Sequence, residues 1–426
     1  MFKALKPFSA IFLTLVIFAA SCSKSSTPTS SVSVQSNQVV LDWNETAYTA
    51  FGGPAYQHSL VASRINAMMH LAMHDALNAI ETKYARYAFN GIDESADPIA
   101  AAAAAAHAVL VSEMPVRQPF LDSALVKSLQ NVKDGEARDR GLDLGRQAAQ
   151  AVLAKRQNDG SVGDPFGKLP PTTEPGAYQT VPPFDIVFAP HWEDVKPFSI
   201  EKKDQFRSAP QPALNSAAYT EAFNEVKEKG RSGSTSRSAE QSAYAKFWYE
   251  FSEAGWNRIA RTVAVTKRLN LLETARLFAL VDMAIADAYI AGWDAKFHYK
   301  FWRPYTAIRN AASDGNENTT PDSSWEPAEP TPPVQDYPST HSALGNAAAT
   351  VLARLLGDKT SFTFSSPTAG PTGSARSFTS FSQAADENAD SRVMAGIHFR
   401  FSCVAGQELG NKIGNWTVDN RLKALQ

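Results

Sequence analysis

A chain of 426 residues is long enough to bury a substantial core, and its 44% apolar and 20% charged residues exclude disorder over most of that length. The 41 basic and 43 acidic side chains leave a formal net charge of −2, which argues against a global binder of nucleic acid or of acidic surfaces. Two cysteines, Cys22 and Cys403, cannot form a disulfide scaffold, so we expect the chemistry to come from histidine, lysine, arginine and serine.

Residues 1–21 have the pattern of a signal peptide. Lys3 and Lys6 form a short basic stretch, an apolar run follows, and small residues lead into Cys22. The run is too short to cross a bilayer comfortably, and its place before a cysteine resembles a bacterial lipoprotein signal, whose cysteine is lipidated. Ala19 stands where such signals usually carry leucine, so ordinary secretion is the alternative. Either way the sequence predicts export. As an envelope lipoprotein, the chain would contact the membrane only through a lipid on Cys22.

The Ser/Thr-rich residues 22–38 predict a flexible tether, and residues 39–426 predict a single all-α domain. Apolar residues at helical spacing recur along the chain, and no run predicts a convincing sheet. The alanine run at 100–106 favours closely packed helices. Helical stripes fall within residues 65–80, 100–114, 121–132, 142–156, 238–256 and 273–299.

Two long segments lack a helical period. Residues 170–197 hold seven prolines, and residues 313–337 are rich in proline and acidic side chains. We expect both to run over the surface, because irregular connections rarely find partners for their backbone inside a core. Loops of this length in a compact domain are often functional lids.

Basic residues gather in the segment WDAKFHYKFWRPYTAIR. Lys296 and Arg303 are seven residues apart, which would place them on one face of a helix that Pro304 ends or kinks. Both cations would then point at the same anion.

Two later segments add a helix start and histidines. Ser339 and Thr340 precede His341 at the start of an apolar helical stripe, where free backbone N–H groups favour an anion. Arg392 and His398 are six apart around a glycine and would diverge by about 120° on an unbroken helix. We therefore expect Arg392 in the first turn of the helix that carries His398, or just before it.

Together these segments predict a pocket with three permanent cations, a helix N-terminus and two histidines, without an obvious carboxylate for a hard metal cage. Such a pocket suits a tetrahedral or trigonal-bipyramidal oxyanion. Each feature alone is explained equally well by an ordinary structural role: a solvated Lys/Arg pair, a packed core histidine or a helix cap. Their ordered recurrence favours a site.

The order and spacing of these residues resemble the three-part signature shared by vanadium-dependent haloperoxidases and type 2 phosphatidic acid phosphatases. Stretches such as MHLAMHDALNAI and SFSQAADENADSRVMAGIHFRF are similar to the haloperoxidase branch, and the resemblance extends from about Asp42 onward. It implies an all-α fold whose helical bundles enclose the site. The residues that carry it are Lys296, Arg303, Pro304, Pro338, Ser339, Thr340, His341, Ser391, Arg392 and His398.

The resemblance also implies roles. His398 would bind the vanadium of a vanadate cofactor, whose site phosphate can also occupy, and His341 would deprotonate hydrogen peroxide. Vanadium would act as a Lewis acid, and halide would be oxidised to hypohalous acid, with a small organic acceptor as a further possible partner. The vanadate oxygens would be neutralised by Lys296, Arg303 and Arg392 and would accept hydrogen bonds from Ser339 and the N–H of Thr340.

Two positions depart from the family pattern. Thr340 stands where glycine is commonest, so its Cβ would crowd the oxyanion, although its hydroxyl could add a contact. Ser402 stands four residues after His398, where many members carry an aspartate that orients the histidine. Its absence disfavours a nucleophilic imidazole. Trp293 either lines the site, as a tryptophan often does in this family, or is a core aromatic.

Alternatives stay open at this stage. A metal-free acid phosphatase would use the same pocket with His398 as nucleophile and His341 as the acid for the leaving group. A non-enzymatic envelope lipoprotein would merely bind phosphate there. His70 and His74 have the spacing of two zinc ligands on a helix, but without a third ligand we favour a role in packing.

Overall fold

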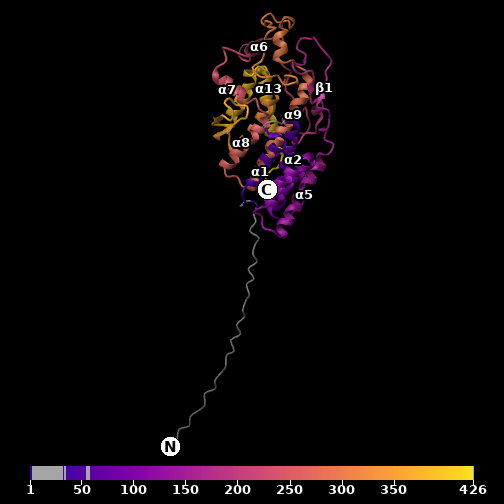
Figure 1. Ribbon diagram of the computed structural model, residues 1–426, viewed down its shortest axis with the longest axis vertical. Coiled ribbons are helices and arrows are strands. Elements are labelled where there is room, and N and C mark those ends of the chain that lie inside the picture. Colours follow the sequence, from indigo (N-terminus) through magenta and orange to yellow (C-terminus); the bar gives the residue numbers. More distant parts are fainter. Residues whose placement is uncertain (2–31, 33–34, 54–57, 426) are drawn as a thin grey trace.

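The computed structural model describes residues 1, 32, 35–53 and 58–425, and it is mostly helical (Figure 1). The α-helices are α1 (Gln38–Ala50), α2 (Ser59–Ile80), α3 (Pro98–Glu113), α4 (Gln118–Leu129), α5 (Glu136–Arg156), α6 (Ala217–Lys229), α7 (Ala239–Phe247), α8 (Ser252–Thr266), α9 (Leu271–Tyr299), α10 (Pro304–Arg309), α11 (Thr340–Leu356), α12 (Phe381–Met394) and α13 (Arg400–Asn420). Short 3-10 helices are η3 (Pro115–Arg117), η4 (Pro190–Asp194) and η5 (Ala311–Ser313). The all-α prediction is confirmed.

Two small antiparallel sheets correct the expectation that no run forms a sheet. Strand β1 (Phe166–Gly167) pairs with β2 (Val187–Phe188), and β3 (Phe362–Ser365) pairs with β4 (Ala375–Phe378). In β3 the phenylalanines face the core and the polar residues face solvent, the alternation of a half-buried strand. A run of four residues is too short to stand out beside the longer helical stripes.

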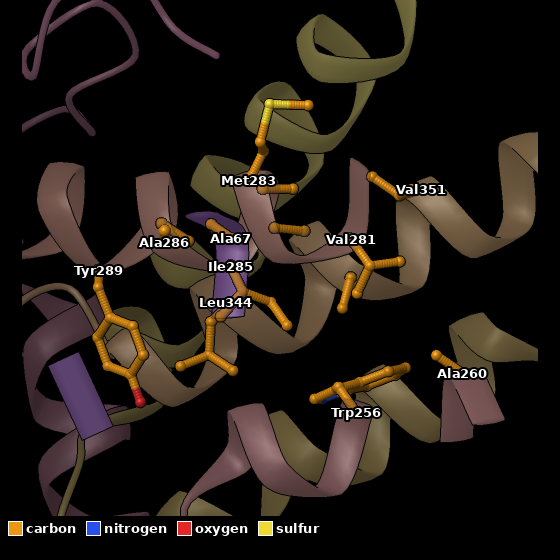
Figure 2. Close-up of a cluster of buried hydrophobic side chains, with 14 of the residues drawn as sticks. Ala67, Trp256, Ala260, Val281, Met283, Ile285, Ala286, Tyr289, Leu344 and Val351 are labelled. Atoms are coloured by element: carbon orange, nitrogen blue, oxygen red, sulfur yellow. The ribbon is translucent and has the colours of Figure 1, made fainter. Parts of the chain in front are cut away.

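Helix α9 is the central element of the fold. Residues 277–297 are all buried, and a helix that is buried on every side has to be surrounded by other elements. Helices α2, α8, α11 and α13 pack against it. Figure 2 shows part of this cluster, in which Ile285 and Tyr289 of α9 lie with Leu344 of α11. Lys296 sits in the last turn of α9, so the same helix carries its charge into the core.

The alanine run forms the close helix contact that the sequence predicts. Residues 100–106 are buried in α3, which packs against α5; there Gly141 and Gly145 lack the side chains that would hold the two backbones apart. A Cβ on Gly145 would lie 2.2 Å from the carbonyl oxygen of Ala101, which no real side chain tolerates.

The two proline-rich loops meet each other and reach the interior. The backbone N–H of Phe188 donates to the carbonyl oxygen of Pro333 at 2.7 Å, which joins the first loop to the second. The second loop continues to Gln335 and Asp336, which are both fully buried. The expectation of a surface lid is therefore wrong for the end of this loop, because it is fixed in the core against α9.

The predicted signal peptide and Cys22 lie outside the described residues. Within the predicted tether, Val32 is buried against the core and Gln38 already begins α1, so the fold starts inside that segment. None of the helices in the described part of the chain is long and apolar enough to cross a membrane.

Candidate active site

The three predicted cations reach one cavity from three chain segments. Lys296 lies in the last turn of α9, Arg303 is the residue before α10, and Arg392 lies in the last turn of α12. All three side chains line the cavity, and each residue is 1% exposed. The sequence therefore predicted correctly that these cations converge.

The backbone that brings Lys296 and Arg303 together differs from the expectation of one continuous helix. Helix α9 ends at Tyr299, Lys300 takes a left-handed conformation with φ of 50°, and Arg303 is extended before Pro304. Proline restricts the residue before it to extended conformations and is itself favoured at the first position of a helix. Pro304 therefore begins α10 instead of kinking α9.

The expected place of Arg392 is wrong as well. Arg392 lies in the last turn of α12, and His398 lies in the short connection between α12 and α13. Gly396, with φ of 79°, turns the chain between them. Because the helix ends before this glycine, both side chains line the same cavity.

Backbone carbonyl groups hold the cations in place. Lys296 Nζ donates to the carbonyl oxygens of Gln335 at 2.6 Å and Asp336 at 3.0 Å. Arg303 donates from Nε to Val334 O and from Nη1 to Ile397 O, both at 2.7 Å. These acceptors orient the cations but carry no full negative charge to neutralise them.

Lys296, Arg303 and Arg392 together form a cradle for an anion, and this cradle is short of negative charge. Burial, above all, lowers the pKa of Lys296 well below its usual value and the pKa of Arg392 to about 10, and the other cations add to both effects. Among the described residues no carboxylate lies at ion-pair distance from either of them, and Arg392 Nε has no hydrogen-bond partner. A bound anion would supply the missing charge and the missing acceptor.

Ser339 and Thr340 have different places at the start of α11. Ser339 caps the helix, since its Oγ accepts from the N–H of Ser342 at 3.5 Å and from the hydroxyl of Ser342 at 3.0 Å. Thr340 and His341 line the cavity, whereas Ser339 lies fully buried behind them. A donor role of Ser339 toward the oxyanion stays a prediction.

The extra side chain of Thr340 has its own space in the fold. It packs over Gly292 of α9, where an added Cβ would lie 3.1 Å from Cγ2 of Thr340. The glycine expected at position 340 is thus matched by a glycine on the facing helix. Thr340 Oγ1 is buried without a hydrogen-bond partner among the described residues, which leaves it available to an oxyanion.

The hydrogen-bond pattern fixes the tautomer of His398. Its Nε2 lies 3.0 Å from Nη1 of Arg303, and arginine only donates, so Nε2 carries the lone pair and Nδ1 carries the proton. Burial first, and then Arg303 and Lys296, lower the pKa of His398 well below its usual value. A neutral imidazole with its Nε2 lone pair among cations can bind a metal centre.

Asp336 is the site residue that the sequence analysis missed. Its Oδ1 lies 2.9 Å from Nδ1 of His398, at hydrogen-bond distance although the angle is not that of a hydrogen bond, and its Oδ2 accepts from the hydroxyl of Ser402. Burial raises the pKa of Asp336 to about 6, against the opposing effects of Arg303, Ser402 and Lys296. The inference of a missing carboxylate is therefore wrong, because a different segment supplies it.

His341 is set up to accept a proton. Its Nε2 lies 2.9 Å from the carbonyl oxygen of Glu250, so Nε2 is the donor and Nδ1 presents the lone pair. Burial, followed by Arg392, lowers the pKa of His341 well below its usual value. The ring is neutral at ordinary pH before an oxyanion binds. The Glu250 carboxylate itself is paired with Arg258.

The cradle opens into a cavity of about 690 Å³. Its other walls are mostly apolar, and the two proline-rich loops supply much of them. Trp293 lines the cavity and donates from its indole nitrogen to Phe188 O at 3.2 Å, so it is both a core aromatic and a wall of the site. The aromatic and proline lining includes Phe166, Phe184, Phe188, Phe251, Tyr289, Trp293, Pro330, Pro332 and Pro333.

The other candidates lie elsewhere in the core. His70 Nδ1 lies 2.6 Å from Asp282, and His74 Nδ1 lies 3.1 Å from Asp75. Both histidines are fully buried in α2, in keeping with the packing role that the sequence favours. Burial raises the pKa of Cys403 to about 12, so its thiol is a small core hydrophobe.

Comparison with known proteins connects this geometry to one family. Residues 276–426 match the family described as the VCPO second helical-bundle domain. The vanadium chloroperoxidase of Curvularia inaequalis is 26% identical to the chain over 496 residues, which cover 88% of this chain and 79% of that protein.

Solved structures agree. The crystal structure of a bacterial vanadium-dependent iodoperoxidase matches with a TM-score of 0.79 at 27% identity, over 92% of this chain and 97% of that one. An apo-type bacterial vanadium-dependent chloroperoxidase, 19% identical, shares the fold with a TM-score of 0.69 over 84% of this chain and 92% of that one. The resemblance inferred from the three-part signature is confirmed, and the signature residues all lie within the segment that the family model matches.

Proposed function

We propose that this chain, a homologue of the vanadium-dependent haloperoxidases, holds vanadate in its buried cradle and oxidises halide with hydrogen peroxide to hypohalous acid. One observation carries the proposal: the Nε2 lone pair of a neutral His398 faces a cluster of three buried cations. Cations alone suit any oxyanion, but an imidazole lone pair among them suits an oxyanion whose central atom accepts a ligand.

The residues present fit vanadate. Among the described residues, Lys296 and Arg392 have no carboxylate at ion-pair distance, and Arg303 has only Asp336, at 3.9 Å. In the same part of the chain, Nε of Arg392 and Oγ1 of Thr340 have no hydrogen-bond partner. His398 is the candidate ligand. When bound, vanadate supplies a Lewis acid that activates hydrogen peroxide toward attack by halide.

The side chains of the pocket accept a proton and stabilise negative charge. The Nδ1 lone pair of His341 accepts a proton from hydrogen peroxide as it enters the site. The three cations stabilise the negative charge that this leaves. In the overall reaction halide gives up two electrons, one oxygen of the peroxide becomes the oxygen of hypohalous acid, and the other leaves as water.

The size of the cavity supports an organic acceptor as well. A volume of about 690 Å³ far exceeds what a halide and a peroxide fill, and the walls away from the cradle are aromatic rings and prolines. Such walls bind apolar or aromatic molecules. We propose that an acceptor of this kind is halogenated beside the cradle.

A phosphatase is the second candidate, and Asp336 favours it. A carboxylate beside Nδ1 is what a nucleophilic histidine needs for orientation and charge stabilisation. The argument against a phosphatase that rested on Ser402 therefore no longer holds. The same pocket would then bind phosphate esters without vanadate.

A paired assay on the purified protein separates these functions. Adding orthovanadate to vanadate-free protein is expected to start peroxide-dependent oxidation of bromide or iodide, and phosphate is expected to compete because the cradle recognises an oxyanion. At 100 times its dissociation constant, vanadate should stabilise the fold by about 2.7 kcal/mol, measured as a rise in Tm.

Hydrolysis of a phosphate ester without vanadate, together with no halide oxidation, would establish the phosphatase instead. Phosphate binding with neither activity would establish a non-enzymatic binder. Halide oxidation that persists after vanadate removal would contradict the proposed cofactor.

We also propose that the protein is exported and held on the cell envelope by a lipid on Cys22, as residues 1–38 suggest. The change Cys22→Ser is expected to move most of the protein from the membrane fraction to the soluble fraction of the envelope, with halide oxidation per mole unchanged. Fractionation followed by immunoblotting measures this. Equal membrane partitioning of the two proteins would favour ordinary secretion or another anchor.

A further inference from the structure

The carboxylate of Asp336 occupies a particular place in the cradle. It is fully buried and lies beside Nδ1 of His398, whereas Arg303 contacts Nε2 of the same ring. Apart from His398, its nearest charged group is Arg303, whose Nη1 lies 3.9 Å from Oδ1. Among the described residues, neither Oδ1 of Asp336 nor Nδ1 of His398 has a hydrogen-bond partner, and the two atoms lie 2.9 Å apart.

This placement acts together with Arg303 in deciding which nitrogen of His398 keeps its lone pair. A neutral imidazole has one proton, and a carboxylate beside Nδ1 attracts that proton to Nδ1. Nε2 is then left as the acceptor that Arg303 already contacts. Without the carboxylate, the contact with Arg303 alone opposes a move of the proton to Nε2, and a protonated nitrogen cannot act as a ligand.

We propose that Asp336 is the positioning residue of His398, and that its carboxylate, anchored by the hydroxyl of Ser402, keeps the Nε2 lone pair directed at the bound oxyanion. This inference rests on the proposed function, since it takes vanadate as the ligand of Nε2. It also explains how the chain manages with a serine four residues after His398. The carboxylate comes from the loop before α11, and Ser402 holds it.

The hydrogen bond from Ser402 to Asp336 links residue 402 to the carboxylate beside His398. Ser402 is fully buried near the start of α13 and donates to Oδ2, while Oδ1 of the same carboxylate faces His398. The backbone N–H of Ser339 in turn donates to the carbonyl oxygen of Ser402 at 2.9 Å, which fixes α13 against the start of α11. Because the side chains of residues 336 and 402 contact each other, a carboxylate carried by residue 402 would also lie close to His398.

The test compares vanadate with phosphate in the full-length protein. Both anions use the cations, but only vanadate takes His398 as a ligand, so the ratio of their dissociation constants reports on the imidazole. The change Asp336→Ala is expected to weaken vanadate binding by about 10- to 100-fold, as for other residues that orient a ligand. Phosphate binding should stay equal or become tighter, because one negative charge leaves the cradle. Vanadium NMR provides a second signal that follows ligation directly.

Three further variants sharpen the result. Asp336→Asn keeps the shape of the side chain and is expected to lose less vanadate affinity than Asp336→Ala. The exchange Asp336→Ser with Ser402→Asp is expected to recover most of the affinity. Asp282→Asn alters another buried Asp–His pair, the one with His70, and should leave the ratio unchanged.

The positioning role is overturned if Asp336→Ala and Asp336→Asn keep the wild-type ratio. Equal loss of vanadate and phosphate binding without recovery in the exchange variant would also overturn it, because that pattern describes a collapsed pocket. A wild-type protein that binds vanadate but oxidises no halide would refute the proposed function alone, and the ratio would still decide the role of Asp336.

Discussion

Replacing His398 with alanine is expected to remove both tight vanadate binding and turnover. His398 supplies an imidazole lone pair, on Nε2, that faces the cradle cations. The contacts that remain are hydrogen bonds and charge interactions with the buried cations, and none of them is a ligand bond to vanadium. We expect phosphate affinity to change far less, because phosphate needs the cations and no ligand bond.

His341→Ala is expected to behave differently. The cradle cations and the start of α11 persist in this variant, so vanadate affinity should stay appreciable. Turnover should fall by about 100- to 10,000-fold, the range typical for loss of an acid–base group. Measuring vanadate affinity and initial rate on both variants checks the division of roles. Equal loss of affinity in the two would contradict it, and a fully active His341→Ala protein would mean that the proton acceptor lies elsewhere.

The helices and the membership of the site were predictable because their signals are local. Apolar stripes at helical spacing locate α2, α5 and α9, and the order of lysine, arginine and histidine residues in three segments marks the cradle. Two errors concerned where helices end, and in both a local signal was present. Pro304 favours an extended Arg303 and a new helix start, and Gly396 is a residue of the kind that ends a helix in the left-handed region.

Asp336 carries no such local signal. It is three residues before Ser339 in an acidic loop, where a carboxylate usually faces solvent. Its contact with His398 depends on how the loop before α11 meets the turn after α12, and that contact spans 62 residues of sequence. The apolar cavity wall depends in the same way on two loops that meet between Phe188 and Pro333. Contacts of this kind are set by the packing of the whole fold.

In the turn after α12, the change Gly396→Ala is expected to destabilise the fold and to displace His398. Gly396 has φ of 79°, and an added Cβ would lie 2.2 Å from the carbonyl oxygen of Gly230. The left-handed conformation costs an alanine about 1–2 kcal/mol, and forcing the backbones apart adds about 1–3 kcal/mol. We therefore expect a loss of about 3 kcal/mol in the free energy of unfolding, with weaker vanadate binding because His398 follows two residues later.

Gly373→Ala is the matched control for this change. Gly373 has nearly the same φ, 78°, but an added Cβ there meets nothing within 4 Å. It should lose only the conformational part, about 1–2 kcal/mol, and bind vanadate as the wild-type protein does. Urea unfolding and vanadate titration of both variants separate backbone strain from the close approach to Gly230. If both variants unfold at the same urea concentration and bind vanadate equally well, the contact with Gly230 does not position His398.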